Sequence, residues 1–273
     1  MGKTAKDSRS IAALVAEILA TALQRGREGI AAWRNPAKDL ERLARRDYVR
    51  ALRRVIAYRE VREIIASAKR IWPAINRAQL GVATKREFER RASRIASPLE
   101  VQLRASPYDG PEGLALLGFY LEQKELSLKR PLIYVNTAHV AGAMSSAFCH
   151  ELGHHMTAQL FKQNRQPVHF FFDADYAAHL DDPVELAADV FVSLAGYPEP
   201  VARRLFSTPW NWAVVARTGK IEGPMLAGIR SHAEGRFGLD LAAKLPAGQK
   251  LRYLAGMIHY AKLRWALLAE YDL

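Results

Sequence analysis

Apolar residues recur at steps of three and four over most of the chain, and this spacing predicts a mostly helical protein. The first third contains few helix-breaking residues. The helices expected there cover these ranges: about 10–24, 38–70 with a break, and 84–96. Pro36, Pro73 and Gly81 mark the expected joints. After residue 200 the clearest helical segment runs from Ile258 to Tyr271.

Two short runs in the middle of the chain are typical of strands. Leu114–Leu121 and Pro131–Asn136 are apolar runs separated by the polar stretch EQKELSLKR. Prolines and small polar residues follow residue 97 and predict a linker. The pattern therefore predicts an α+β protein, mostly α. Its expected parts are a helical region at 1–97, a linker at 98–111 and a domain at 112–273.

One helical segment carries the residues that indicate chemistry. The run 144–161, MSSAFCHELGHHMTAQLF, has no proline and spaces its apolar residues as an amphipathic helix does. Within it His150, Glu151 and His154 form an HExxH motif. Positions i and i+4 share one face of a helix, so both imidazoles can bind one Zn²⁺ while Glu151 deprotonates a zinc-activated water. The alternative is a buried helix whose histidines hydrogen-bond to their neighbours.

A catalytic zinc needs a third protein ligand and an open position. The segment 181–198 predicts a helix that starts near Asp182 with Pro183 in its first turn. Glu185 lies one turn inside this helix and is the candidate third ligand. Asp189 lies four residues further on the same face, where it can accept a hydrogen bond from a ligand imidazole. Such a ligand set also accepts Mn²⁺ or Fe²⁺.

Peptide hydrolysis also needs a donor for the developing oxyanion. His179, Tyr176 and Tyr197 are near the third-ligand helix in sequence and are candidates, with a structural role as the alternative for each. Gly153 lies inside the HExxH helix, where glycine costs about 1 kcal/mol relative to alanine. We therefore expect another backbone, or the metal, to approach the helix closely at Gly153.

The two helical segments and the preceding strand together resemble the ImmA/IrrE family of gluzincin-type metallopeptidases. The matching pieces are PLIYVN ending at Asn136, HELGH at 150–154 and ELAADVF at 185–191. The piece SLAGYP at 193–198 departs from the two leucines, methionine and proline that are usual in the family. The resemblance covers roughly residues 112 to 200.

The resemblance implies a zincin-like core, in which a small sheet packs on two helices. It implies zinc ligands His150, His154 and Glu185, a general base at Glu151, and hydrolysis of a peptide bond in a protein substrate. Characterised members cleave helix-turn-helix transcriptional repressors in stress responses, but a fold alone does not transfer a substrate. Two other classes stay open. One is a catalytically silent zinc-binding regulator, and the other is a peptidase or amidase with a different target.

The excess positive charge lies in the N-terminal third. Residues 1–97 hold 23 of the 40 Lys and Arg and 10 of the 28 Asp and Glu, whereas the whole chain has a net charge of +12. Six arginines at helical spacing would form a basic stripe: Arg42, Arg45, Arg46, Arg50, Arg53 and Arg54. This stripe could bind nucleic-acid phosphates or an acidic partner. The alternative is a solvated helix face.

The beginning of the chain has the outline of a secretory signal, because basic residues precede the apolar stretch Ile11–Leu23. Glu17 divides that stretch, and its apolar spacing is that of a helix that faces a core, which we favour. No stretch approaches the roughly 20 apolar residues of a membrane span. A single cysteine, Cys149, excludes an internal disulfide and fits a cytoplasmic protein. Oligomeric state is not indicated.

Overall fold

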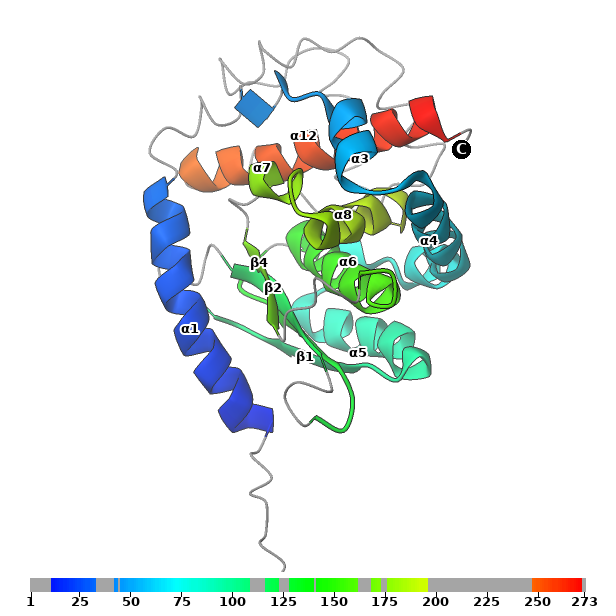
Figure 1. Cartoon of the computed structure of the whole chain (residues 1–273). Helices are drawn as coiled ribbons and strands as arrows, with labels where there is room; N and C mark the ends of the chain where they lie inside the picture. The colour runs from blue at the N-terminus through cyan, green and yellow to red at the C-terminus, as the bar shows by residue number, and fades with distance from the viewer. Residues whose placement is uncertain are drawn as a thin grey trace, which may run out of the picture.

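The computed structural model describes residues 11–32, 42–43, 45–108, 116–122, 128–139, 141–161, 168–172, 176–195 and 247–271. Within these ranges the protein is mostly helical and has a small mixed sheet of four strands (Figure 1). The predicted class, α+β and mostly α, is confirmed. None of the helices in these ranges is long and apolar enough to cross a membrane.

Helices both precede and follow the strands along the chain. In chain order, the α-helices are α1 (Ile11–Ala32), α3 (Tyr48–Val55), α4 (Tyr58–Ala78), α5 (Lys85–Ala96), α6 (Ala141–Thr157), α7 (Tyr176–His179), α8 (Pro183–Ala195) and α12 (Ala247–Glu270). Two 3₁₀ turns are η1 (Leu80–Val82) and η2 (Ser97–Leu99). The strands are β1 (Gln102–Ser106), β2 (Leu116–Leu121), β3 (Leu132–Asn136) and β4 (Val168–Phe172).

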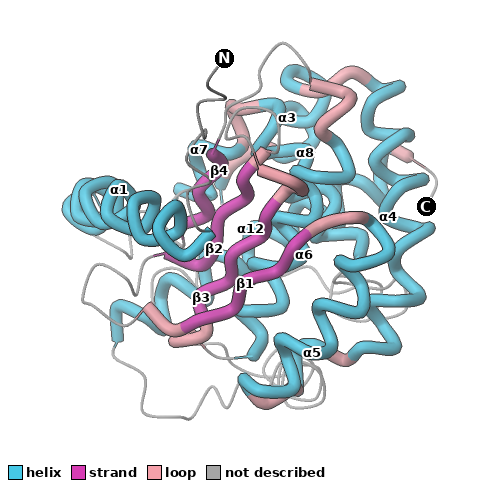
Figure 2. The backbone as a smooth tube through the Cα atoms, turned by 90° about the horizontal axis from the view of Figure 1, so that it is seen from below, coloured by secondary structure: helices cyan, strands magenta, loops and turns pink. Residues whose placement is uncertain are grey.

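The sheet has the strand order β1-β3-β2-β4, which Figure 2 shows from below. β1 pairs in parallel with β3, and β2 is antiparallel to both β3 and β4. Successive side chains of a strand point to opposite faces of the sheet. The face toward α6 buries Leu117, Tyr120, Ile133, Val135 and Phe171. The opposite face buries Leu116, Phe119, Leu132, Tyr134 and Phe172 together with α1.

The predicted apolar stripe of α1 faces this second side of the sheet. Leu14, Val15 and Ile18 are buried there, whereas Glu17 is exposed. The interpretation of this stretch as a helix that packs on a core is therefore confirmed for these side chains.

The expected linker at 98–111 is corrected by the structure, because residues 102–106 form β1 and pair with β3. β1 is an edge strand of the described sheet, and none of its side chains is fully buried. A strand in such a position needs no apolar run, so its sequence resembles that of a loop. The helices before it also bury side chains such as Leu52 and Phe88 in the same core as α6 and α8, so the described residues show no separate N-terminal core.

The expected helix at 38–70 is interrupted, as predicted, between α3 and α4 at Ile56 and Ala57. The side chain of Asp47 caps α3 by accepting a hydrogen bond of 3.0 Å from Arg50 N. Pro73 does not end a helix. It lies inside α4, which continues to Ala78.

Gly153 lets α6 and α8 approach each other closely, as its position in the helix predicted. A Cβ atom at Gly153 would lie 2.9 Å from Ala188 Cα and 3.2 Å from Phe191 Cβ. No larger residue fits without moving one of the helices. The approach is to backbone rather than to a metal, and it brings the polar side chains of α6 and α8 together.

Candidate metal centre

His150 and His154 lie one turn apart on α6 and direct their Nε2 atoms at the same point. The two Nε2 atoms are 3.1 Å apart, and both side chains are buried. Aromatic neighbours from β4 fix the two rings. Phe171 stacks on His150 with the ring centroids 4.1 Å apart, and His169 stacks on His154 at 4.3 Å.

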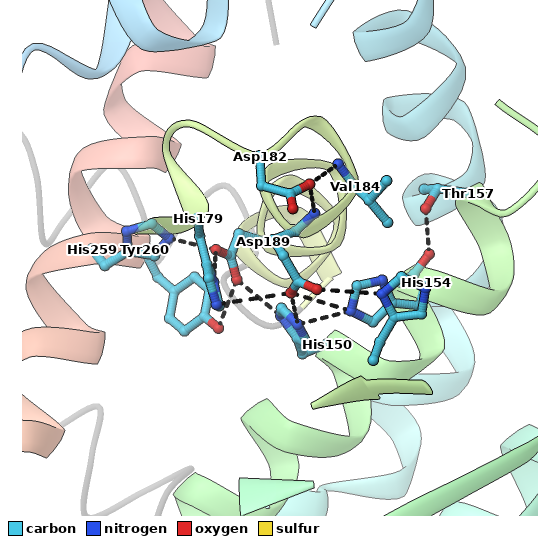
Figure 3. Close-up of polar contacts among 12 residues, drawn as sticks. His150, His154, Thr157, His179, Asp182, Val184, Asp189, His259 and Tyr260 are labelled. Atoms are coloured by element: carbon cyan, nitrogen blue, oxygen red, sulfur yellow. Dashed lines mark hydrogen bonds and ion pairs between the residues drawn. The ribbon is translucent and has the colours of Figure 1, made fainter. Parts of the chain in front are cut away.

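The start of α8 places Glu185 opposite these imidazoles. Asp182 caps the helix, because its Oδ1 accepts hydrogen bonds from Val184 N at 2.8 Å and Glu185 N at 3.3 Å (Figure 3). Pro183 occupies the first helical position, where its missing N–H costs nothing. Glu185 Oε2 then lies 3.1 Å from His150 Nε2 and 3.4 Å from His154 Nε2.

These three atoms fit a tetrahedral metal. Bonds of about 2.0–2.1 Å to zinc place tetrahedral ligand atoms roughly 3.3–3.4 Å apart, and the observed separations are 3.1, 3.1 and 3.4 Å. Within the described part of the chain, no fourth His, Cys, Asp or Glu atom lies within 4.8 Å of all three. The arrangement therefore offers three protein ligands and leaves one position for water or substrate.

Glu151 lies beside this ligand set with both carboxylate oxygens buried and without a hydrogen-bond partner in the structure. β2 makes room for it at Gly118, where a Cβ atom would lie 3.2 Å from Glu151 Oε1. Burial raises the pKa of Glu151 well above its usual value, against the opposing effect of His150. A buried carboxylate without a partner is costly, and a water or a cation would satisfy it.

Asp189 of α8 is a fully buried hydrogen-bond acceptor at the back of the site. Its Oδ1 accepts a hydrogen bond of 2.9 Å from His150 Nδ1, so the hydrogen bond predicted between Asp189 and a ligand imidazole is present. Because this bond holds a proton on Nδ1, Nε2 is the atom of His150 that can bind a metal once its own proton is lost. The other partners of Asp189 are His179 Nδ1 at 2.8 Å, His259 Nε2 at 2.9 Å and the Tyr260 hydroxyl at 3.1 Å (Figure 3).

The pKa values of the two candidate ligand histidines are shifted in opposite directions when no cation is present. Burial alone would lower the pKa of His150, but its hydrogen bonds to Asp189 and Glu185 raise that pKa to about 10. Burial lowers the pKa of His154 to about 3, despite the charge of Glu185. Of the two imidazoles, His150 therefore carries the extra proton, and its Nε2–H can donate to Glu185 or to His154.

The three candidate oxyanion donors are His179, Tyr176 and Tyr197, and the structure gives the contacts of the first two. His179 donates Nδ1–H to Asp189, and its Nε2 lies 3.8 Å from Glu185 Oε2. Burial lowers the pKa of His179, but the charge and hydrogen bond of Asp189 outweigh it, so the net pKa is raised. Tyr176 packs its hydroxyl against α12, where a Cβ at Gly256 would lie 2.6 Å from it. Tyr197 lies outside the described residues.

Three buried residues at this site belong to none of the sequence motifs. His169 Nδ1 lies 3.3 Å from Glu185 Oε1 and belongs to β4, a strand that the apolar pattern does not predict. His259 and Tyr260 lie in the helix expected at 258–271, but 70 residues separate His259 from Asp189. His169 could have been found from the sequence only by recognising the alternation of a strand, which puts His169 and Phe171 on the same face.

The basic stripe is partly neutralised within the chain. Arg46 and Arg54 both form ion pairs with Asp181, the first at 2.9 Å, and Arg53 pairs with Glu270 at 2.6 Å. These contacts link α3 to the turn before α8 and to the end of α12. Each pair is at least partly exposed and contributes at most about 1 kcal/mol. Arg46, Arg53 and Arg54 of the predicted stripe therefore make contacts inside the protein.

A small pocket with room for about one water molecule lies beside His154. Its walls are Tyr120, Glu122, His154, Thr157, Ala158, Phe161, His169 and Val184. Four of these residues are aromatic or aliphatic, and the other four carry polar groups that can hydrogen-bond a water next to the candidate metal ligands.

Comparison of the chain with protein-family models, curated proteins and solved structures finds no match. What the protein does must therefore be inferred from the site. The strongest observation there is the convergence of His150, His154 and Glu185 beside a carboxylate that has no partner.

Proposed function

We propose that this protein is a zinc-dependent endopeptidase that hydrolyses a peptide bond in a protein substrate. The observation that carries the proposal is the set of three ligand atoms at tetrahedral spacing, with the unpartnered Glu151 next to them. The resemblance to the ImmA/IrrE metallopeptidases supports it. His150, Glu151, His154 and Glu185, which match that family's motifs, are the residues that meet at this site.

Each side chain has a role that follows from its surroundings. His150, His154 and Glu185 would hold the ion, and Asp189 keeps the His150 ring in the tautomer that binds metal. A bound zinc ion supplies Lewis acidity, which lowers the pKa of water and polarises a carbonyl group. Glu151 takes the proton of the attacking water and passes it to the leaving amine, a task that its raised pKa suits.

His179 is the preferred oxyanion donor among the candidates. Asp189 holds its Nδ1–H and favours the imidazolium form, so Nε2–H is the donor that faces Glu185 and the ligand set. Tyr176 directs its hydroxyl at α12 instead.

The substrate backbone is expected to lie along β4. This strand is at the edge of the described sheet, and its His169 and Phe171 contact the metal site. An extended peptide can add to such an edge by backbone hydrogen bonds. The pocket beside His154 would then hold a water molecule close to the scissile bond. Helix-turn-helix repressors are the substrate class that the family resemblance suggests.

The test combines metal analysis with cleavage. Wild type, His154→Ala and Glu151→Gln are purified and their zinc content is measured. Each is also incubated with an unstructured peptide library and co-expressed with helix-turn-helix repressors. We expect about one zinc per chain in wild type and Glu151→Gln, and a loss of zinc in His154→Ala. Only the wild type should cleave. Cleavage that survives Glu151→Gln would contradict the mechanism, and stoichiometric zinc without cleavage would favour a zinc-binding regulator.

A further inference from the structure

We infer that α12 completes the metal centre, with His259 and Tyr260 as positioning residues that set its metal affinity through Asp189. This inference rests on the proposed metal site. Neither residue belongs to the motifs that indicate the site, and both lie about 70 positions beyond Asp189 in the chain.

The hydrogen bonds of Asp189 divide evenly between the metal site and α12. Oδ1 accepts from His150 at 2.9 Å and from the Tyr260 hydroxyl at 3.1 Å. Oδ2 accepts from His179 at 2.8 Å and from His259 at 2.9 Å. Each carboxylate oxygen therefore joins one residue of the site to one residue of α12, as Figure 3 shows.

This arrangement uses the whole acceptor capacity of the carboxylate, which has about four lone-pair positions. Asp189, His150 and His259 are 0% exposed, so water does not substitute for a lost donor without rearrangement. Donors from α6 and α7 contact each carboxylate oxygen from one side, and the donors from α12 contact it from the other. The two donors from α12 therefore narrow the range over which the carboxylate plane can turn, and this plane sets the direction of the His150 ring and hence of Nε2.

His259 is itself held from a third direction. Its Nε2–H must donate to the carboxylate, so Nδ1 accepts a hydrogen bond of 3.1 Å from the Tyr48 hydroxyl of α3. The tautomer of His259 is therefore defined by its two partners. A hydrogen-bonded path runs from α3 through α12 and Asp189 to the ligand His150.

α12 has packing of its own that does not depend on this network. Leu263, Ala266 and Leu267 are fully buried in the main core. Replacing one polar group of His259 or Tyr260 should therefore leave the helix in place while releasing Asp189. This separation allows a positioning role to be distinguished from a role in folding alone.

The test compares full-length wild type with Tyr260→Phe and His259→Gln. Tyr134→Phe is the matched control, because it also removes a buried tyrosine hydroxyl, one that donates to Ser106 O at 3.0 Å in the sheet. Zinc affinity is measured by competition with a chromogenic chelator, and thermal unfolding is followed with and without zinc. The visible spectrum of the cobalt-substituted proteins reports ligand geometry.

We expect Tyr260→Phe and His259→Gln to weaken zinc binding about tenfold, as losses of partners behind metal ligands do. They should also reduce the zinc-induced rise in Tm and alter the cobalt spectrum. Tyr134→Phe should lower Tm but keep wild-type zinc affinity. If His259→Gln does not fold, Tyr260→Phe decides the question.

Wild-type zinc affinity in folded Tyr260→Phe would overturn the inference while leaving the proposed function intact. The absence of zinc binding by wild type would instead overturn the proposed function, and the inference with it. Tenfold weaker binding in the variants, together with a wild type that cleaves nothing, would support the inference and count against the endopeptidase proposal alone.

Discussion

Zinc binding to this protein should release protons, and its affinity should therefore rise with pH. In the metal-free site His150 Nε2 lies 3.1 Å from both His154 Nε2 and Glu185 Oε2, so a proton on His150 Nε2 has two acceptors. Burial alone would lower the pKa of His150, but the hydrogen bonds that it donates to Asp189 and Glu185 raise this pKa to about 10, whereas burial lowers the pKa of His154 to about 3. Between these values one proton occupies the pair, and a metal ion must replace it.

The magnitude follows from this proton count. Release of one proton per ion raises the apparent association constant about tenfold for each pH unit, or about 1.4 kcal/mol. Zinc affinity therefore falls as the pH falls, because acid favours the protonated form of His150, which competes with zinc. Glu151 adds a fraction of a second proton, since burial raises its pKa and a nearby cation lowers it again.

Chelator competition between about pH 6 and pH 8 would measure the slope, and calorimetry in buffers with different ionisation enthalpies would count the protons. Glu151→Gln is the control, since it keeps the three ligands and removes the second source of protons. We expect its slope to be one and the wild-type slope to be one or greater. Zinc affinity that does not change over this range would show that both imidazoles are already neutral and would refute the reasoning.

Three further predictions follow from the structure. Gly153→Ala should lower the free energy of unfolding by about 1–2 kcal/mol in chemical denaturation, because the clash with Ala188 exceeds the gain in helix propensity; a more stable variant would contradict the close approach of α6 and α8. His179→Gln should reduce kcat about 10²- to 10³-fold in peptide cleavage at saturating zinc, a larger effect than the roughly tenfold loss of zinc affinity expected when Asp189 loses one donor. An unchanged kcat would assign the oxyanion role elsewhere. Asp181→Asn should change Tm little, because its ion pairs with Arg46 and Arg54 are about half exposed and contribute at most about 1 kcal/mol each. A large fall in Tm would show that these ion pairs stabilise the protein more than their exposure implies.

The residues of the candidate ligand set could be predicted because each part of it is local. HExxH places His150 and His154 on one helix face by spacing alone, and the four-residue step from Glu185 to Asp189 does the same on α8. The position of Gly153 inside a helical segment likewise indicated that another part of the molecule approaches this helix closely. The convergence of α6 and α8 on one point was an expectation from the motif, and in the structure it depends on that glycine.

Other parts of the fold and site depend on contacts between distant segments. β1 is half exposed at the sheet edge, so its sequence carries no apolar signal. His259 stands in an apolar helix whose periodicity is recognisable, but nothing in that periodicity identifies Asp189 as its partner. The arginine spacing of α3 predicted a cationic stripe, yet the acidic partners of that stripe, Asp181 and Glu270, come from remote positions.

The charge balance of the core explains why so many histidines gather at this site. Glu151 and Asp189 are buried and Glu185 is partly buried, and these three carboxyl groups lie in one cluster. The side-chain partners of Glu185 and Asp189 given by the structure are histidines and one tyrosine, whereas Glu151 has no hydrogen-bond partner. Neutral imidazoles satisfy the hydrogen bonds of Asp189 but leave its charge uncompensated, and buried charges are expensive unless paired. Protonation of His150 and His179 offsets part of this charge, as the raised pKa values of both indicate. A divalent cation at the ligand set would displace the His150 proton and supply two positive charges, which improves the balance and gives Glu151 a water to deprotonate.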